Sequence, residues 1–305
     1  MTRFVASKVL QSILTILGVL TAAFFLVHLS GDPTALMLSE QASAAEVAAL
    51  RSELGLDRPL WFQYGLFLDR ALHAEFGNSL RQHISALSLV LDRLPATLEL
   101  ALTAFALGLF LAFVAVLGVR LSGSRRLRTV LFWFALTRQA IPVFWFGLLL
   151  ILLFSVTLRW LPSLGRGGIE HLILPALTLA TFELALYIRL LDSAFAEQQS
   201  QDYVRTAYAK GQTRTRVILR HMLPNAMLPL ITIAGINLGV LLGGTVVTET
   251  VFSWPGVGRL IVQAVSQRDY PVVIAGVLVT SIIFVALNLL VDLLYAVLDP
   301  RVRLS

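Results

Sequence analysis

Four ionisable residues lie inside or at the ends of long apolar stretches of the sequence: Glu99, Arg138, Glu183 and Asp292. A charge at the centre of a membrane helix costs about 2.5 to 3.5 kcal/mol, so such residues usually pair with a polar group or line a path for a solute. Glu99 and Arg138 fall near stretch ends, where we expect water to reach them. Glu183 and Asp292, with the amide of Asn237, are therefore candidates for a pathway or gate, and hydrogen bonding within a helix bundle is the alternative.

A second candidate is the basic segment DYVRTAYAKGQTRTRVILRHMLPNAMLPLIT, residues 202–232. Asp202 is a suitable N-cap for a helix, and Gly211 can end that helix in a left-handed conformation that glycine adopts at little cost. A second helix is then expected over 214–222, closed by Pro224. Charge alone leaves a simpler alternative open, a basic hairpin that rests on anionic lipid headgroups at about 1 kcal/mol per Lys or Arg.

The sequence contains none of the common catalytic motifs. It lacks the G-x-x-x-x-G-K-[ST] phosphate loop, the H-E-x-x-H zinc motif and the G-x-S-x-G nucleophile motif. It has no cysteine, and its five histidines are scattered without the spacing of metal ligands. We therefore expect no catalytic residue, no bound cofactor and no metal site in this chain.

The composition is that of an integral membrane protein, with 57% hydrophobic and 14% charged residues and a mean hydropathy of +0.81. A helix needs about 20 apolar residues to cross the hydrocarbon core, and a helix satisfies its own backbone groups in lipid. Six stretches qualify, at 9–29, 96–118, 131–155, 172–191, 226–247 and 272–297. The first is longer than the core of a signal peptide, so we interpret it as a retained span.

Positive charges indicate the orientation, because Lys and Arg collect in cytoplasmic loops. If the N-terminus is inside, the inner segments hold fourteen Lys and Arg residues. The two short outer loops then hold only Arg159, Arg166, Arg259 and Arg268. Both termini are therefore expected in the cytoplasm, and the net charge of +6 requires no nucleic acid as a partner.

The apolar stretches also divide the chain into parts. These are an N-terminal span with an outer segment (1–95), a core of five spans (96–298) that includes the inner loop 192–224, and a cytoplasmic tail (299–305). In the outer segment, Ser43 and Glu46 form a capping box that predicts one helix, and a second helix is expected from about Pro59.

Short stretches along nearly the whole chain carry a further signal. The inner loop carries RTAYAKG and then RHMLPNA. Further stretches are GDP at 31–33, FGNSL at 76–80, RLPATLELAL at 93–102, IPVFWFGLLLILLF at 141–154, HLILPALTLA at 171–180, ETVFSWPGVGRL at 249–260, RDYPVV at 268–273 and NLLVDLLYAVLDPRVR at 288–303. In their order and spacing they resemble the permeases of ABC importers, specifically the dipeptide, oligopeptide and nickel family, and the inner loop is similar to that family's cytoplasmic loop. Any one of them would be weak, but together they identify the chain as a member of the family.

The resemblance implies an all-α membrane protein of six transmembrane helices, with the type I ABC importer permease (MetI-like) fold and a cytoplasmic coupling helix. Such a permease lies among the lipids of the bacterial inner membrane and forms the translocation pathway with a second, dissimilar permease. Two ATP-binding subunits use ATP, and a periplasmic or lipid-anchored binding protein delivers the cargo. That cargo is a di- or oligopeptide or a related small solute, such as a metal chelate.

In the family, the inner loop docks into a cleft of the ATPase. The positions that we assign to ATPase coupling on this resemblance are Tyr203, Arg205, Ala207, Lys210, Gly211, Arg214, Arg216, Leu223 and Pro224. The general permease signature has Glu-Ala-Ala where this chain has Arg-Thr-Ala at 205–207, and Ile where it has His221. Gly211 fits the signature, and the turn needs its backbone freedom.

Two glycine-containing patterns lie near the end of the core. The outer loop SWPGVG is expected near the outer mouth of the pathway, with a plain turn as the alternative; its assigned residues are Trp254, Pro255, Gly256 and Gly258. Gly235, Gly239 and Gly243 recur every four residues on the fifth span. They predict close packing against another helix, of this chain or of a partner.

Two other classes of protein remain as alternatives. A secondary transporter would show an internal repeat of spans with broken helices in both halves, and we find no such repeat. A membrane-embedded enzyme would need a catalytic constellation. Glu99, Glu183 and Asp292 could supply carboxylates for one, but they belong to no catalytic motif.

Overall fold

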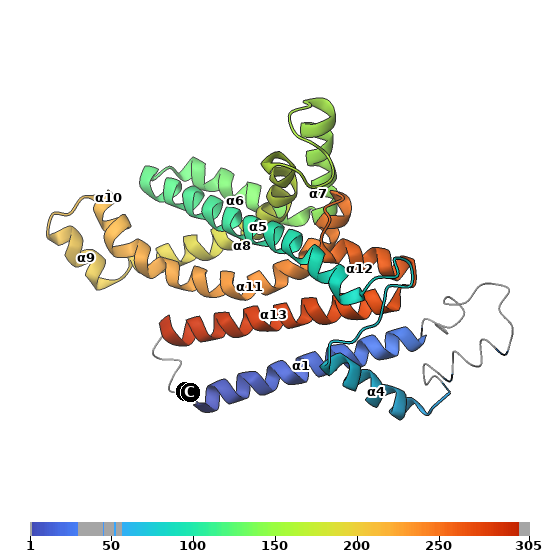
Figure 1. Cartoon of the computed structure of the whole chain (residues 1–305). Helices are drawn as coiled ribbons and strands as arrows, with labels where there is room; N and C mark the ends of the chain where they lie inside the picture. Colours follow the sequence, from blue (N-terminus) through green and yellow to red (C-terminus); the bar gives the residue numbers. More distant parts are fainter. Residues whose placement is uncertain (1, 30–44, 46–51, 53–56, 299–305) are drawn as a thin grey trace. The chain divides into compact units, whose positions relative to one another are not determined.

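The computed structural model describes residues 2–29, 45, 52 and 57–298, and within them the side chains at 7–26, 45, 52 and 57–291. The described chain is helical apart from turns, loops and an isolated β-bridge between Asn78 and Ser85 (Figure 1). The α-helices are α1 (Thr2–Leu29), α4 (Leu60–Leu72), α5 (Ala86–Ser122), α6 (Arg125–Ala140), α7 (Val143–Leu150), α8 (Ile169–Gln199), α9 (Asp202–Ala209), α10 (Arg214–Val217), α11 (Leu223–Val251), α12 (Val257–Ser266) and α13 (Tyr270–Leu298). Two π-helical segments, η1 (Ile151–Thr157) and η2 (Ile218–Met222), continue α7 and α10.

Five helical segments of the described chain are long and apolar enough to cross a membrane, namely 7–26, 86–122, 169–199, 214–251 and 270–291. A sixth span results if α6, α7 and η1 are taken together, although the two parts meet at a bend of 109°. Each apolar stretch found in the sequence lies within α1, α5, the bent pair from α6 to η1, α8, α11 or α13. The all-helical membrane class predicted from the sequence is confirmed.

The third apolar stretch, expected as one span over 131–155, is broken in the structure. α6 ends at Ala140, and Ile141 has an extended backbone with φ −88° and ψ 125°. Pro142 then precedes the first residue of α7. The break follows from the sequence, because a proline ring disfavours the helical conformation of the residue before it and removes a backbone donor.

Arg138 lies buried at this break with 2% of its surface exposed, which corrects the expectation that water reaches it. Its guanidinium donates hydrogen bonds to Thr181 Oγ1 and the Thr178 carbonyl, both at 2.9 Å, and to the Ile141 carbonyl at 3.0 Å. The ring centre of Phe146 is 4.0 Å from its central carbon. The arginine thus satisfies a carbonyl at the break and joins α6 to α8.

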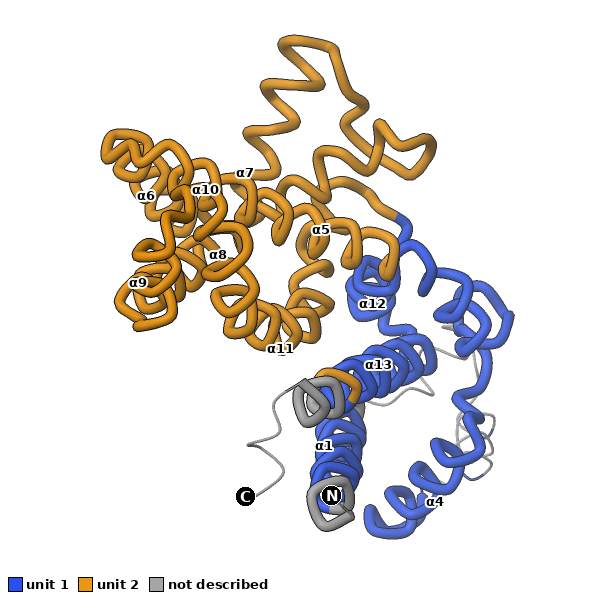
Figure 2. The backbone as a smooth tube through the Cα atoms, turned by 90° about the vertical axis from the view of Figure 1, so that its left-hand side faces the viewer, with its two compact units in different colours: residues 1–96, 255–289 blue, residues 97–254, 290–305 orange. Residues whose placement is uncertain are grey.

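The chain divides into two compact units, which Figure 2 colours separately. One comprises residues 1–96 and 255–289, and the other comprises 97–254 and 290–305. In the first unit, an apolar core forms where the start of α5 meets α12 and α13, with Ala86, Val257 and Ala275 fully buried.

The first unit also contains the segment that follows α1. The helix expected from Pro59 is α4, for which Pro59 is the N-cap residue. It packs on α1 through a hydrogen bond of 2.6 Å between the hydroxyls of Tyr64 and Thr21, and through the rings of Phe67 and Phe24, whose centres are 5.5 Å apart. The helix predicted by the capping box at Ser43 and Glu46 lies outside the described residues.

A buried carboxylate holds the loop between α4 and α5. Asp269 is 3% exposed and accepts hydrogen bonds from the Ser79 hydroxyl at 2.5 Å and from the Leu80 backbone at 3.1 Å. This contact joins FGNSL to RDYPVV, two of the stretches that carry the family resemblance. The similarity of these two stretches to the family therefore has a structural explanation: together they anchor this loop.

The second unit is built around α8, which packs against α6, α7 and α11. Tyr187, Ile188, Leu191 and Phe195 of α8 have no exposed surface. Of the glycine stripe on α11, a Cβ at Gly235 would come within 2.7 Å of Val291 Cγ1, whereas no described atom lies within 4 Å of one at Gly243. Packing among the described residues therefore explains Gly235 but does not explain Gly243.

Candidate functional site

The basic segment forms the helix, turn and helix that the sequence predicted. α9 runs over Asp202–Ala209, and Gly211 has φ +74°, which confirms the left-handed turn. Two details differ from the prediction. The N-cap residue of α9 is Gln201, with Asp202 in the first turn. The second helix starts as α10 and continues as the π-helical η2 before α11 begins.

One face of this segment is buried in the core of the second unit. Val204 and Ala207 of α9 and Val217, Ile218 and Met222 beyond the turn are at most 4% exposed. They belong to the same apolar cluster as residues of α8 and α11. The segment is thus packed against two spans by the apolar positions that alternate with its charged ones.

The opposite face is exposed, and its charged residues are mostly basic. Among the residues assigned to coupling, those with exposed surface are Tyr203, Arg205, Lys210, Gly211, Arg214, Arg216 and Pro224. Ala207 is buried and Leu223 is half-buried, so these two contact the body of the protein. The structure therefore separates the assigned residues into an exposed set and a packing set.

Polar contacts fix the geometry of the segment. The Tyr203 hydroxyl donates to Gln198 Oε1 at 2.5 Å and accepts from the amide of Asn225 at 3.2 Å, so it links the end of α8 to the start of α11. Beyond the turn, His221 Nε2 lies 2.9 Å from Gln212 Oε1.

A network of arginines around Asp192 connects the segment to three spans. The Asp192 carboxylate, on α8, accepts hydrogen bonds from Arg120 of α5 at 2.5 Å and from Arg128 of α6 at 2.7 Å. Arg214 of α10 donates to the backbone carbonyl of Arg120 at 2.9 Å. Sequence reasoning missed this network, because its members are up to 94 residues apart and no local pattern relates them.

The pathway candidates Glu183 and Asn237 are brought together. Asn237 of α11 donates from its amide to Glu183 Oε2 of α8 at 3.0 Å. Glu183 is 8% exposed, and the fully buried Tyr187 follows one turn later on the same helix. Asp292, the third candidate, belongs to α13, but its side chain lies outside the described residues.

Glu99 is paired near the opposite end of the second unit from Asp192, since it lies early in α5 and Arg120 lies late. Arg166 donates to Glu99 Oε2 from Nε at 2.9 Å and from Nη2 at 2.5 Å. The side chain of Glu99 is 39% exposed.

The assigned outer loop is tightly bound at its start. Trp254 is 1% exposed, and its backbone donates to the carbonyl of Glu249 at 2.8 Å. Glu249 is itself fully buried, and its carboxylate accepts a hydrogen bond of 2.7 Å from Thr97. Gly256 is the N-cap residue of α12, and Pro255 and Gly258 lie on either side of it. The loop is an ordered connection between α11 and α12.

Comparison with known proteins identifies the family to which these features belong. The model described as "Binding-protein-dependent transport system inner membrane component" matches residues 90–304, and the model of the corresponding N-terminal part matches residues 1–101. The chain belongs to this family of permeases.

Two relatives match the permease over its whole length. The glutathione transport system permease protein GsiC of Salmonella choleraesuis (strain SC-B67) is 39% identical over 304 residues, with 99% of each chain covered. The dipeptide transport system permease protein DppB of Escherichia coli (strain K12) is 38% identical over 337 residues, again with 99% of each covered. These relatives belong to the peptide-transport permeases that the sequence motifs indicated, so that assignment of the family is confirmed.

A solved structure shows the same fold. The crystal structure of an amino acid ABC transporter with histidines matches the permease with a TM-score of 0.53 at 15% identity, over 68% of this chain and 94% of that one. The matched family model and the full-length relatives make the permease a multi-pass inner-membrane subunit of a binding-protein-dependent ABC importer, as the sequence predicted. By its family, it acts together with other subunits of that system.

Proposed function

We propose that this permease imports di- or oligopeptides or related small solutes, including metal chelates. Support comes from the names of the relatives, which include a glutathione permease and a dipeptide permease. The permease forms the pathway with a second, dissimilar permease, and a binding protein outside the membrane delivers the cargo. Two partner subunits bind and hydrolyse ATP, while this chain catalyses no reaction and binds no cofactor. Both of its termini lie in the cytoplasm, as the positive charges indicate.

The strongest structural support for this proposal comes from the coupling segment, α9 to η2. Its exposed basic face is available to an ATPase, and its apolar face is packed into the spans. A movement of the ATPase that displaces the segment is therefore transmitted to α8 and α11 by contact, and to α5 and α6 through Asp192. Rigid-body movement of membrane helices between inward-open and outward-open states needs such an attached lever.

Along the pathway, Glu183 and Asn237 contact the cargo. They supply a carboxylate and an amide at mid-length of two apolar helices, where polar groups are costly to keep without a role. Trp254, Pro255, Gly256 and Gly258 lie at the outer mouth, where cargo enters.

The assembly is tested by purifying the permease from its native membrane in mild detergent and identifying the proteins that elute with it. We expect a second permease and two proteins with phosphate loops. Purified complex in proteoliposomes should then hydrolyse ATP faster when binding protein and a dipeptide or glutathione are present. Recovery of the permease alone, under conditions that preserve other membrane complexes, would contradict the proposal and favour a secondary transporter.

The coupling role is tested with Gly211→Pro. Gly211 has φ +74°, whereas proline is held near about −65° and has no N–H; the Gly211 N–H donates to the Tyr208 carbonyl at 2.9 Å. We expect the variant to insert and fold but to lose stimulated ATP hydrolysis at least tenfold, about 1.4 kcal/mol in activation free energy. Gly77→Pro is the matched control, because Gly77 has φ +79° but lies in the loop before α5. Normal stimulated hydrolysis in Gly211→Pro, or equal loss in both variants, would contradict the coupling role.

A further inference from the structure

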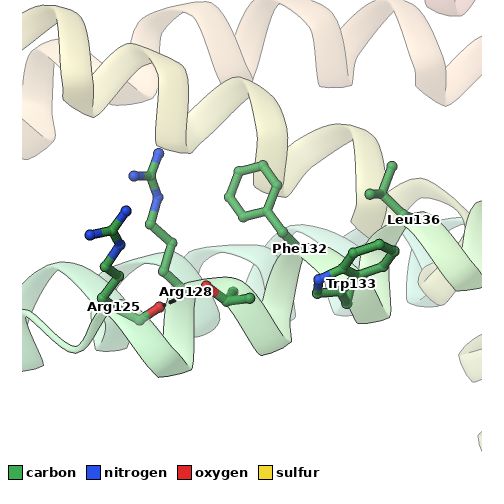
Figure 3. Close-up of a pocket in the computed structure, with 6 residues that line it drawn as sticks. Arg125, Arg128, Phe132, Trp133 and Leu136 are labelled. Carbon is green, nitrogen blue, oxygen red and sulfur yellow. Dashed lines mark hydrogen bonds between the residues drawn. The ribbon is translucent and has the colours of Figure 1, made fainter.

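One face of α6 combines arginines with aromatic and aliphatic side chains around a pocket. The pocket has a volume of about 270 Å³ and is lined, at intervals of one helical turn, by Arg125, Arg128, Thr129, Phe132, Trp133 and Leu136. Figure 3 shows the two guanidinium groups at one end of this row and the apolar side chains at the other. From Arg125 to Leu136 the helix rises by about 16 Å, so the pocket follows the helix axis.

The polar end has an excess of positive charge. Arg125 is exposed and forms no ion pair with a described residue. Arg128 uses Nη2 to bind Asp192 at 2.7 Å, is 53% exposed, and keeps its other N–H groups available. Arg120 shares the same carboxylate, so the contacts of the described residues bring a single negative charge to this group of arginines.

The apolar end is not covered by any part of the chain that the structure describes. Trp133 is 66% exposed and Leu136 is 47% exposed, while Phe132 is half-buried. In a membrane protein such side chains face lipid or another protein, and tryptophan concentrates at the level of the lipid headgroups. The row therefore passes from headgroup chemistry to acyl-chain chemistry along a single helix.

We propose that this face of α6 binds an anionic phospholipid. The phosphate accepts hydrogen bonds from Arg125 and from the free edge of Arg128, since a planar guanidinium binds two oxygens of a phosphate at once. The acyl chains lie along Phe132, Trp133 and Leu136. Charge complementarity decides the occupant: an apolar helix of another protein would cover the rings but leave the charge of Arg125 unpaired. Arg128 also binds Asp192, so the lipid supports the end of α6 that the Asp192 network holds.

The test compares two neighbouring arginines that differ in their relation to the pocket. Arg125 lines it, and the equally charged, exposed Arg126 does not. The full chain with its co-purifying partners is reconstituted in phosphatidylcholine with phosphatidylglycerol, extracted in mild detergent, and its retained lipid is counted by native mass spectrometry. We expect Arg125→Gln to lower retained phosphatidylglycerol about fivefold, the equivalent of about 1 kcal/mol for one arginine at a membrane surface. Arg126→Gln should retain as much as the wild type.

A photoreactive amino acid in place of Trp133 provides a second measurement that needs no loss of function. We expect it to form adducts with phosphatidylglycerol, and fewer of them when Arg125→Gln is added. Three results would each overturn the proposal. Arg125→Gln and Arg126→Gln could retain the same amount of phosphatidylglycerol, or the wild type could retain phosphatidylcholine as well as it retains phosphatidylglycerol. The photoreactive residue at position 133 could also cross-link to a second permease in place of lipid.

Discussion

Helix α8 carries two buried carboxylates with opposite surroundings, Glu183 and Asp192. Asp192 accepts hydrogen bonds from two arginines, at 2.5 and 2.7 Å. Glu183 accepts one, from the neutral amide of Asn237 at 3.0 Å, and no described cation lies within ion-pair distance of it. The negative charge of Asp192 is therefore balanced within the fold, whereas Glu183 has no cation as a partner among the described residues.

The comparison distinguishes structural from functional use of the same chemical group. An internally balanced carboxylate holds helices together, and its loss should affect stability. A carboxylate that is buried without a cation is costly to keep. Under the proposed function, a cargo with a positive charge, such as the amino group of a peptide, would supply the balance during transport.

The largest effect is expected when Asp192 is replaced by alanine. Removing it leaves Arg120, whose side chain is 16% exposed, without its carboxylate, and breaking a buried pair in this way costs about 3 to 5 kcal/mol. We expect aggregated or unassembled permease in size-exclusion chromatography of the detergent extract. Asp202→Ala is the control, since the Asp202 side chain is 97% exposed and such pairs contribute about 0 to 1 kcal/mol. Equal behaviour of the two variants would show that Asp192 is not an anchor.

An intermediate effect, on transport alone, is expected from Glu183→Gln. Glutamine keeps the size and can still bond Asn237, but it carries no charge. We expect normal assembly and an uptake of dipeptide into proteoliposomes that is at least tenfold lower, about 1.4 kcal/mol in activation free energy. Glu170→Gln, on the same helix with a side chain 49% exposed, should transport normally. Unchanged uptake together with a lowered melting temperature would assign Glu183 to structural pairing instead.

The smallest effect is expected from Arg128→Gln, compared with the same substitution of Arg120, the other arginine bound to Asp192. Arg128 has a side chain 53% exposed, compared with 16% for Arg120. Because an exposed pair contributes little, Arg128→Gln should lower the unfolding free energy by at most about 1 kcal/mol. Arg120→Gln should cost clearly more, since it also removes the hydrogen bond to the Asp192 carbonyl. Thermal unfolding in one detergent measures both, and a larger effect at Arg128 would reverse the assignment.

The sequence predicted what depends on local patterns. Apolar length predicted the spans, and the position of Gly211 at the end of a short helical stretch predicted its left-handed turn. The proline at 142 was also a local signal, and it could have predicted the break in the third stretch. Its effect was hidden because apolar residues continue on both sides of the break, and hydropathy does not distinguish a straight helix from two joined ones.

Contacts between distant residues could not be predicted in this way. Arg138 looked like a residue at a span end, and only the packing of α6 on α8 shows that Thr178 and Thr181 supply its acceptors. The partners of Asp192 are 64 and 72 residues away from it. Single-sequence patterns indicate which groups are costly to bury, but the fold decides which partner each one finds.

The π-helical η2 sets the angle between the coupling segment and the span that follows it. Its backbone bond runs from Leu223 back to the carbonyl of Ile218, five residues earlier, in place of four. One added residue in a helix turns everything before it by about 100° relative to everything after it. The number of residues in η2 therefore determines the side of α11 on which α9 and α10 lie. Deletion of a single residue between 218 and 222 would leave the exposed basic face of α9 and α10 intact but turn that face in another direction.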